Sequence, residues 1–196
     1  MGLERMLLEL ESLRTPKKVS FDYELDTEAG SLEAIRTEEY NIALLDVGFL
    51  RKIPFVLNGD IVRVVKEVYD ASVDAGSNAF NFFKWVVGNI TYGERKRGKK
   101  GYRNSVEVFE DREGVCGEMS VLYLAMVRAI GIRGSYVHVD VDYKGKNVNH
   151  ACAMLDLKGR EGFNILVDPA YREYDIRHRS FTPLTDFEAY KYFNAH

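Results

Sequence analysis

Three residues that could carry out chemistry follow one another in the second half of this sequence: Cys116, then His150, then Asp168. A thiolate is a strong nucleophile, an imidazole can take and return a proton, and a carboxylate can orient the imidazole. Cysteines at helix N-termini ionise more readily than free cysteine. The order and the residue types therefore predict nucleophilic catalysis by Cys116, assisted by the other two side chains.

The segment that begins at Cys116 has the pattern of a buried helix. Its apolar residues recur at intervals of three and four: Met119, Leu122, Tyr123, Met126, Val127 and Ile130. Gly131 follows as the C-terminal signal, and Arg128 suits the negative end of the helix dipole. Gly114 and Gly117 flank the cysteine and allow a close approach of backbone or ligand. Cys116 is thus expected at the positive end of a core helix.

Three strands are expected after this helix, at residues 136–143, 148–157 and 163–168. In the first strand, valines alternate with polar residues. In the second strand, alternation puts His150 and Cys152 on one face and Ala151 on the other. The third strand ends at Pro169, which lacks the N–H that a strand interior needs. Antiparallel pairing of the second and third strands would bring His150 beside Asp168.

Several short motifs occur in the same order as in one known family. They are Trp85–Tyr92 (WVVGNITY), Gly114–Glu118 (GVCGE), Arg128–Ile132 (RAIGI), His150-Ala151 and Asp168-Pro169. Through these motifs the chain resembles the transglutaminase-like superfamily over about residues 61–171. The resemblance implies an α+β papain-like cysteine proteinase fold, in which a central helix starting at the catalytic cysteine packs on an antiparallel sheet.

Two features depart from the family pattern. Cys152 stands where an aromatic residue often follows the His-Ala pair, and the chain contains no glutamine, so a papain-type glutamine cannot stabilise the oxyanion. The backbone N–H of Cys116 is one replacement. By analogy with the aromatic donor of the family, the side chain of Tyr92 or Trp85 is a candidate for the second donor.

The composition favours one compact enzyme domain of 196 residues, with an N-terminal extension at residues 1–58 packed on a catalytic core at residues 59–196. The net charge of −3 gives no case for nucleic-acid binding. No apolar run reaches the roughly 18–20 residues of a membrane span, and no signal peptide is apparent. Two cysteines suit a reducing cytoplasm. The missing glutamine and 29% charged residues favour a thermophilic source.

Other interpretations stay open at this point. A zinc site built from Cys116, His150, Cys152 and Asp168 is the rival chemistry, although it lacks the paired Cys-x-x-Cys spacing of structural sites. Cys152 is expected in the core. His138, His178 and the basic run at residues 95–100 are expected in solvent. We expect no metal and no cofactor.

The function expected from the residues and the resemblance is acyl transfer through a thioester. Cys116 would attack the carbonyl of a peptide, protein or other amide substrate, His150 would move the proton, and Asp168 would orient the imidazole. Water as the acceptor makes the protein a peptidase or amidase, which we favour. An amine acceptor makes it a protein-glutamine transglutaminase, and a non-catalytic peptide-binding member of the superfamily is the third possibility.

Overall fold

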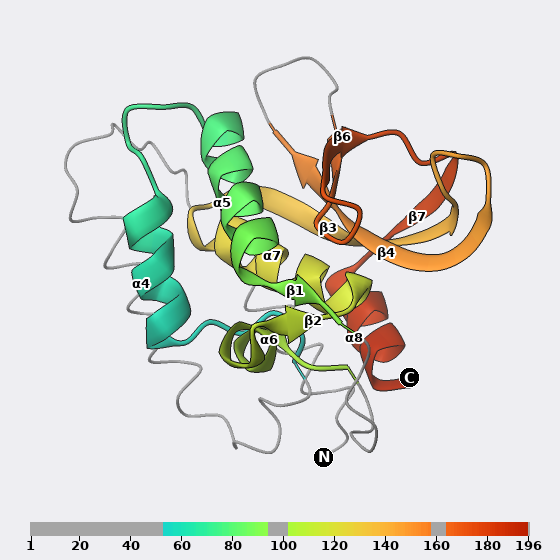
Figure 1. The fold of residues 1–196 in the computed structure, drawn as a ribbon, viewed down its shortest axis with the longest axis horizontal. Coiled ribbons are helices and arrows are strands. Elements are labelled where there is room, and N and C mark those ends of the chain that lie inside the picture. Colours follow the sequence, from blue (N-terminus) through green and yellow to red (C-terminus); the bar gives the residue numbers. More distant parts are fainter. Residues whose placement is uncertain (1–52, 94–101, 158–163, 196) are drawn as a thin grey trace, which may run out of the picture. The chain divides into compact units, whose positions relative to one another are not determined.

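The computed structural model describes residues 53–93, 102–157 and 164–195 (Figure 1). The chain divides into two units, Met1–Ala34 and Ile35–His196, and all described residues lie in the second unit. Most of the expected extension at residues 1–58, and the basic run at residues 95–100, lie outside the described residues. The domain boundary at residue 58 stays a prediction.

Helices dominate the first part of the described chain and strands the second, as Figure 1 shows. In chain order the elements are α4 (Gly59–Val68), α5 (Ala75–Asn89), β1 (Thr91–Tyr92), α6 (Ser105–Asp111), β2 (Glu113–Gly114), α7 (Cys116–Ala129), β3 (Arg133–Val141), β4 (Asn147–Asp156), β5 (Asn164–Asp168), β6 (Glu173–Ile176), β7 (Ser180–Leu184) and α8 (Asp186–Ala195). None of the described helices is long and apolar enough to cross a membrane.

The strands form two sheets. Five of them make an antiparallel sheet in the order β6-β5-β4-β3-β7, whereas β1 and β2 form a short parallel pair of their own. The three strands expected from the sequence correspond to β3, β4 and β5, with ends that differ from the expected ones by at most three residues. The α+β class with a helix packed on an antiparallel sheet is confirmed.

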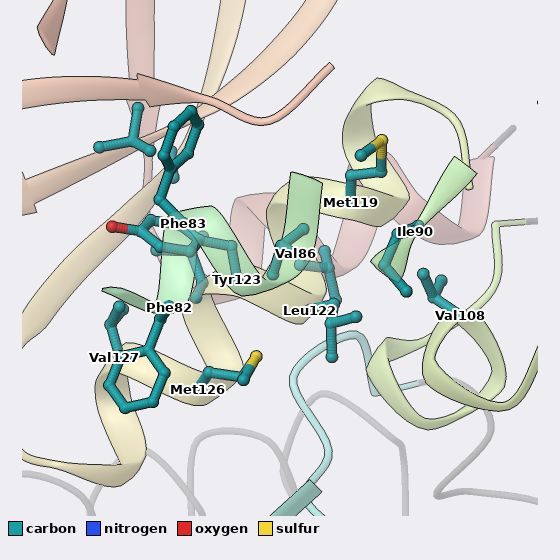
Figure 2. Packing of buried hydrophobic residues seen from close by; sticks show 14 of the residues in the cluster. Phe82, Phe83, Val86, Ile90, Val108, Met119, Leu122, Tyr123, Met126 and Val127 are labelled. Atoms are coloured by element: carbon teal, nitrogen blue, oxygen red, sulfur yellow. The ribbon is translucent and has the colours of Figure 1, made fainter. Parts of the chain in front are cut away.

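Helix α7 is the centre of the core. It contacts α4, α5 and α6 as well as β3 and β4, and every residue from Gly117 to Val127 is buried. Such a helix is shielded all round, as expected of a core helix. Figure 2 shows how Phe82, Phe83 and Val86 of α5 pack against it. The Tyr123 hydroxyl also donates to the Ala79 carbonyl at 3.1 Å, which fixes α5 on α7.

The C-terminal end of α7 confirms the predicted glycine stop. Gly131 has φ +81°, in the left-handed region that favours glycine. The N–H of Gly131 donates to the Arg128 carbonyl at 3.0 Å, and the N–H of Ile132 donates to the Val127 carbonyl at 3.1 Å. These two bonds form a Schellman motif, which satisfies carbonyls at the helix end.

The two faces of β4 have different surroundings. Ala151, Ala153 and Leu155 face the core around α7. Cys152 packs in a second apolar cluster with Val137, Val139, Leu166 and Ile176. The predicted alternation along this strand is therefore confirmed, and so is the prediction that Cys152 is a core residue. Burial raises the pKa of the Cys152 thiol well above its usual value.

Candidate active site

A buried ion pair holds the turn that precedes α7. The Glu118 carboxylate is fully buried and accepts from the backbone N–H of Val115 at 3.0 Å. It also accepts from the backbone N–H of Arg103 at 2.8 Å and from its guanidinium at 2.9 Å. The same guanidinium bonds to Asp111 at 2.7 Å. A buried pair with several hydrogen bonds is costly to disrupt, so these contacts fix the backbone next to Cys116.

The first turn of α7 has no side-chain cap. Val115 occupies the N-cap position and has no polar side-chain atom to accept from the first turn. The first N–H groups of a helix have no partner within the helix, and they carry the positive end of its dipole. Cys116 is the first residue of α7 and is partly exposed. Its sulfur therefore lies where the helix favours negative charge.

His150 and Asp168 lie side by side, as the predicted strand pairing requires. The distance from His150 Nε2 to Asp168 Oδ2 is 2.6 Å, and the two residues are only 6% and 0% exposed. The second carboxylate oxygen, Oδ1, accepts from the backbone N–H of Tyr171 at 2.9 Å. The Tyr171 ring also stacks on the His150 ring with centroids 4.4 Å apart. Both side chains are thus held in one orientation.

The His150 imidazole also interacts electrostatically with the Cys116 side chain. Burial by itself lowers the pKa of His150, but the hydrogen bond to Asp168 and the interaction with Cys116 outweigh burial and raise the pKa to about 9. Burial likewise disfavours the Asp168 carboxylate, yet the hydrogen bonds from His150 and His178 hold its pKa below the usual value. The structure therefore joins His150 and Asp168 by a hydrogen bond, and Cys116 interacts with this pair electrostatically.

His178 joins this network, and the prediction that it lies in solvent is wrong. Its side chain is fully buried, and its Nε2 lies 3.1 Å from Asp168 Oδ2. Two imidazoles thus share one carboxylate oxygen. The sequence does hold a signal for this burial, because Ile176 and His178 alternate with the charged residues Asp175, Arg177 and Arg179, as in a strand with one buried face. His138, also expected in solvent, is partly buried beside Asp140.

One group of possible metal ligands occurs in the described parts of the chain: His150, Asp168 and His178, whose ligand atoms lie within 4.8 Å of one another. Neither Cys116 nor Cys152, the cysteines of the rival zinc site, belongs to it. Ligand atoms around a tetrahedral zinc ion are about 3.3 Å apart. The 2.6 Å contact between His150 and Asp168 is shorter and has the length of a charge-assisted hydrogen bond. The arrangement favours a hydrogen-bonded network over a shared ion.

The two aromatic oxyanion candidates lie on neighbouring elements. Tyr92 belongs to β1 and is 57% exposed. Trp85 belongs to α5, where its ring stacks on Phe109 at 5.6 Å and lies beneath the Arg112 guanidinium. These contacts do not test either residue as an oxyanion donor, so both assignments stay predictions.

Comparisons with solved structures find the same fold. Legionella pneumophila LapG, in an EGTA-treated form, shares 8% identity with this chain at a TM-score of 0.50, and the match covers 76% of this chain and 78% of LapG. A candidate cysteine protease from Cytophaga hutchinsonii shares 17% identity at a TM-score of 0.48. That match covers 66% of this chain and 50% of the other, so this chain spans half the length of that protein. No curated protein sequence gives a significant match.

The comparison with protein families identifies the core. Residues 62–165 match the transglutaminase-like superfamily, and this span is more than half of the 196 residues. It includes α7 with Cys116 at its start and the strand that carries His150. The structural likeness to LapG agrees with a papain-like fold. The chain belongs to the transglutaminase-like superfamily.

Proposed function

We propose that this protein is a cysteine hydrolase that cleaves amide bonds in a peptide or protein through a thioester intermediate. The observation that carries the proposal is the buried hydrogen bond between His150 and Asp168, together with the electrostatic interaction of His150 with Cys116 at the start of α7. Membership of the superfamily supports it, because the matched residues 62–165 include Cys116 and His150. Buried, mutually perturbed titratable groups of this kind are typical of catalytic sites.

In the proposed reaction the Cys116 sulfur attacks the amide carbonyl carbon, and the proton of the thiol is held by His150. The new S–C bond pushes the carbonyl electron pair onto oxygen. When that pair returns, the C–N bond breaks and His150 gives its proton to the leaving amine. Water, deprotonated by His150, then hydrolyses the thioester to release the acid and free Cys116. Asp168 stays ionised and keeps the imidazole in place, as the carboxylate does in related triads.

His178 acts in this scheme as a positioning residue. Its hydrogen bond to Asp168 Oδ2, together with the Tyr171 N–H bond to Oδ1, leaves the carboxylate one orientation. It also offsets the cost of burying a carboxylate that is 0% exposed. A site with a fixed carboxylate holds the imidazole at the angle that the reaction needs.

The test uses 4-nitrophenyl acetate, an activated ester that acylates cysteine nucleophiles. We expect a rapid burst of 4-nitrophenolate and a mass increase of one acetyl group on the wild-type protein, localised to Cys116 by peptide mapping. Cys116→Ala should abolish both signals, whereas Cys152→Ala should retain them. Acetylation elsewhere, or an undiminished burst from Cys116→Ala, would refute the proposal.

The acceptor is tested on the same acyl-enzyme. A glutamine-containing peptide is supplied with an excess of a labelled primary amine, and the products are compared by mass. We expect the hydrolysed acid to dominate. A dominant amine adduct that disappears in Cys116→Ala would identify a transferase instead, with the same three residues in the same roles.

A further inference from the structure

The hydroxyl of Tyr136 is buried at the same helix end. Tyr136 lies on β3 and is 1% exposed, and its hydroxyl has no hydrogen-bond partner among the described residues. A buried hydroxyl without a partner costs roughly 1–3 kcal/mol, so folded proteins rarely keep one without a reason. The Tyr136 hydroxyl can therefore donate a hydrogen bond to a group that is not part of the described protein.

The Tyr136 hydroxyl occupies space that is free because residue 117 is a glycine. A Cβ atom at residue 117 would collide with the Tyr136 hydroxyl and would contact the Cβ of Ala151. Gly117 is the second residue of α7, directly after Cys116, so the hydroxyl lies against the first turn of the helix. Tyr136 and Cys116 also interact electrostatically. Only a glycine at position 117 permits this close approach.

The surroundings keep the Tyr136 side chain in place and protonated. Its ring contacts Tyr192 and Phe193 of α8, with centroids 6.0 and 6.5 Å apart. Burial raises its pKa well above the usual value, and the negative charge that Cys116 can carry adds to this effect. The phenol therefore remains a donor throughout the pH range in which a cysteine hydrolase works.

An oxyanion formed on a carbonyl bound to Cys116 needs donors at this place. The uncapped N–H groups at the start of α7 supply backbone donors, and a hydroxyl beside them would supply a side-chain donor. We propose that the Tyr136 hydroxyl, together with the backbone N–H of Cys116, forms the oxyanion hole of this protein. This inference rests on the proposed function and fills the role for which the chain has no glutamine.

The test separates a carbonyl reaction from a displacement that forms no oxyanion. Acylation of Cys116 by 4-nitrophenyl acetate passes through a tetrahedral oxyanion, whereas alkylation by iodoacetamide displaces iodide from a saturated carbon. Tyr136→Phe should lower the burst rate with the ester by about 10²–10³-fold, the usual effect of removing one oxyanion donor. The rate of alkylation should stay within about threefold of wild type. Unfolding in urea should show no loss of stability, because the substitution removes an unpartnered hydroxyl.

Two matched tyrosine variants serve as controls. Tyr123→Phe removes a buried hydroxyl that donates to the Ala79 carbonyl, so it should lose stability and keep the burst rate. Tyr92→Phe tests the other candidate donor, and a fall in its burst rate with an unchanged rate in Tyr136→Phe would overturn the inference.

An unchanged burst rate in Tyr136→Phe, or an equal fall in acylation and alkylation, would overturn the inference while leaving the proposed function standing. If the wild-type protein is not acylated on Cys116, the proposed function fails and the inference fails with it.

Discussion

The two ends of α7 differ in how their unpaired backbone N–H and carbonyl groups are satisfied. At the C-terminal end, Gly131 and Ile132 close a Schellman motif, and Arg128 donates to the Gly134 carbonyl at 2.6 Å and to Asp186 at 2.8 Å. At the N-terminal end, Glu118 binds the backbone of Val115, and no side chain caps the first turn. At the C-terminal end, backbone and side-chain hydrogen bonds therefore terminate the helix. At the N-terminal end, Glu118 fixes the backbone of Val115, while the first N–H groups of the helix have no side-chain cap.

The largest expected effect is on the rate of thiol alkylation. At pH 7, iodoacetamide should alkylate Cys116 at least about 100-fold faster than Cys152, because reactivity follows thiolate content and exposure. Cys152 is fully buried in an apolar cluster, and burial raises its pKa. The rates are measured by intact mass and peptide mapping.

A cysteine placed at the opposite end of α7 provides the control. In a Cys116→Ala background, Ala129→Cys puts a partly exposed thiol at the negative end of the same helix. It should react much more slowly than Cys116, since both the helix dipole and the neighbouring imidazole are missing. Equal rates for the two positions would show that the helix end contributes nothing to reactivity.

The second effect concerns stability at the N-terminal end. Glu118→Gln neutralises one of the two carboxylates that bind the buried Arg103 guanidinium and leaves only Asp111, so the loss should approach the roughly 3–5 kcal/mol of a broken buried pair. Arg128→Ala is the matched change at the other end. It removes a partly exposed pair with Asp186 and should cost about 1 kcal/mol or less. Urea unfolding at pH 7 compares the two variants, and equal losses would contradict the distinction between a buried and an exposed ion pair.

The features that the sequence predicts are local ones. The period of apolar residues and Gly131 define α7, and β4 and β5 are consecutive strands, so the pairing of His150 with Asp168 follows from a simple hairpin. His178 could not be placed in the same way. The chain crosses from β6 at one edge of the sheet to β7 at the other, and His178 lies on that crossing. The position of the Tyr136 hydroxyl depends on how α7 and α8 pack, which no short-range pattern contains.

The third effect is a pH dependence confined to the N-terminal end. The pKa of His150 rises from 6.5 to about 9 on folding, so the stabilisation it provides is complete below pH 6.5 and is lost as the pH rises through 9. The pKa of Asp168 is lowered, so its contribution is present above pH 3.8 and is lost as the pH falls through its folded value.

The difference in unfolding free energy between wild type and His150→Gln should therefore shrink by about 2–3 kcal/mol between pH 6.5 and pH 10. Urea titrations across this range measure the difference. A constant difference would mean that His150 is neutral in the folded protein at pH 6.5.

The smallest effect belongs to the C-terminal end. Gly131→Ala forces a side chain into the left-handed region and should cost about 1 kcal/mol, although the added methyl group meets no neighbour. Gly88→Ala is the matched control, because Gly88 lies inside α5 with open space around it and should gain roughly 0.5–1 kcal/mol. Both variants should keep the wild-type burst rate with 4-nitrophenyl acetate. A loss of activity in Gly131→Ala would show that the two ends of α7 are coupled.

The proposed nucleophile and its proposed base come from different layers of the molecule, since Cys116 belongs to a helix whereas His150 and Asp168 belong to the sheet. No covalent neighbour holds the sulfur against the imidazole; only the packing of α7 on β3 and β4 does so. The distance between the Cys116 sulfur and the His150 imidazole therefore depends on how α7 packs on the sheet. In the proposed function, a shift of α7 relative to β4 would therefore separate Cys116 from His150 and lower activity without changing either residue.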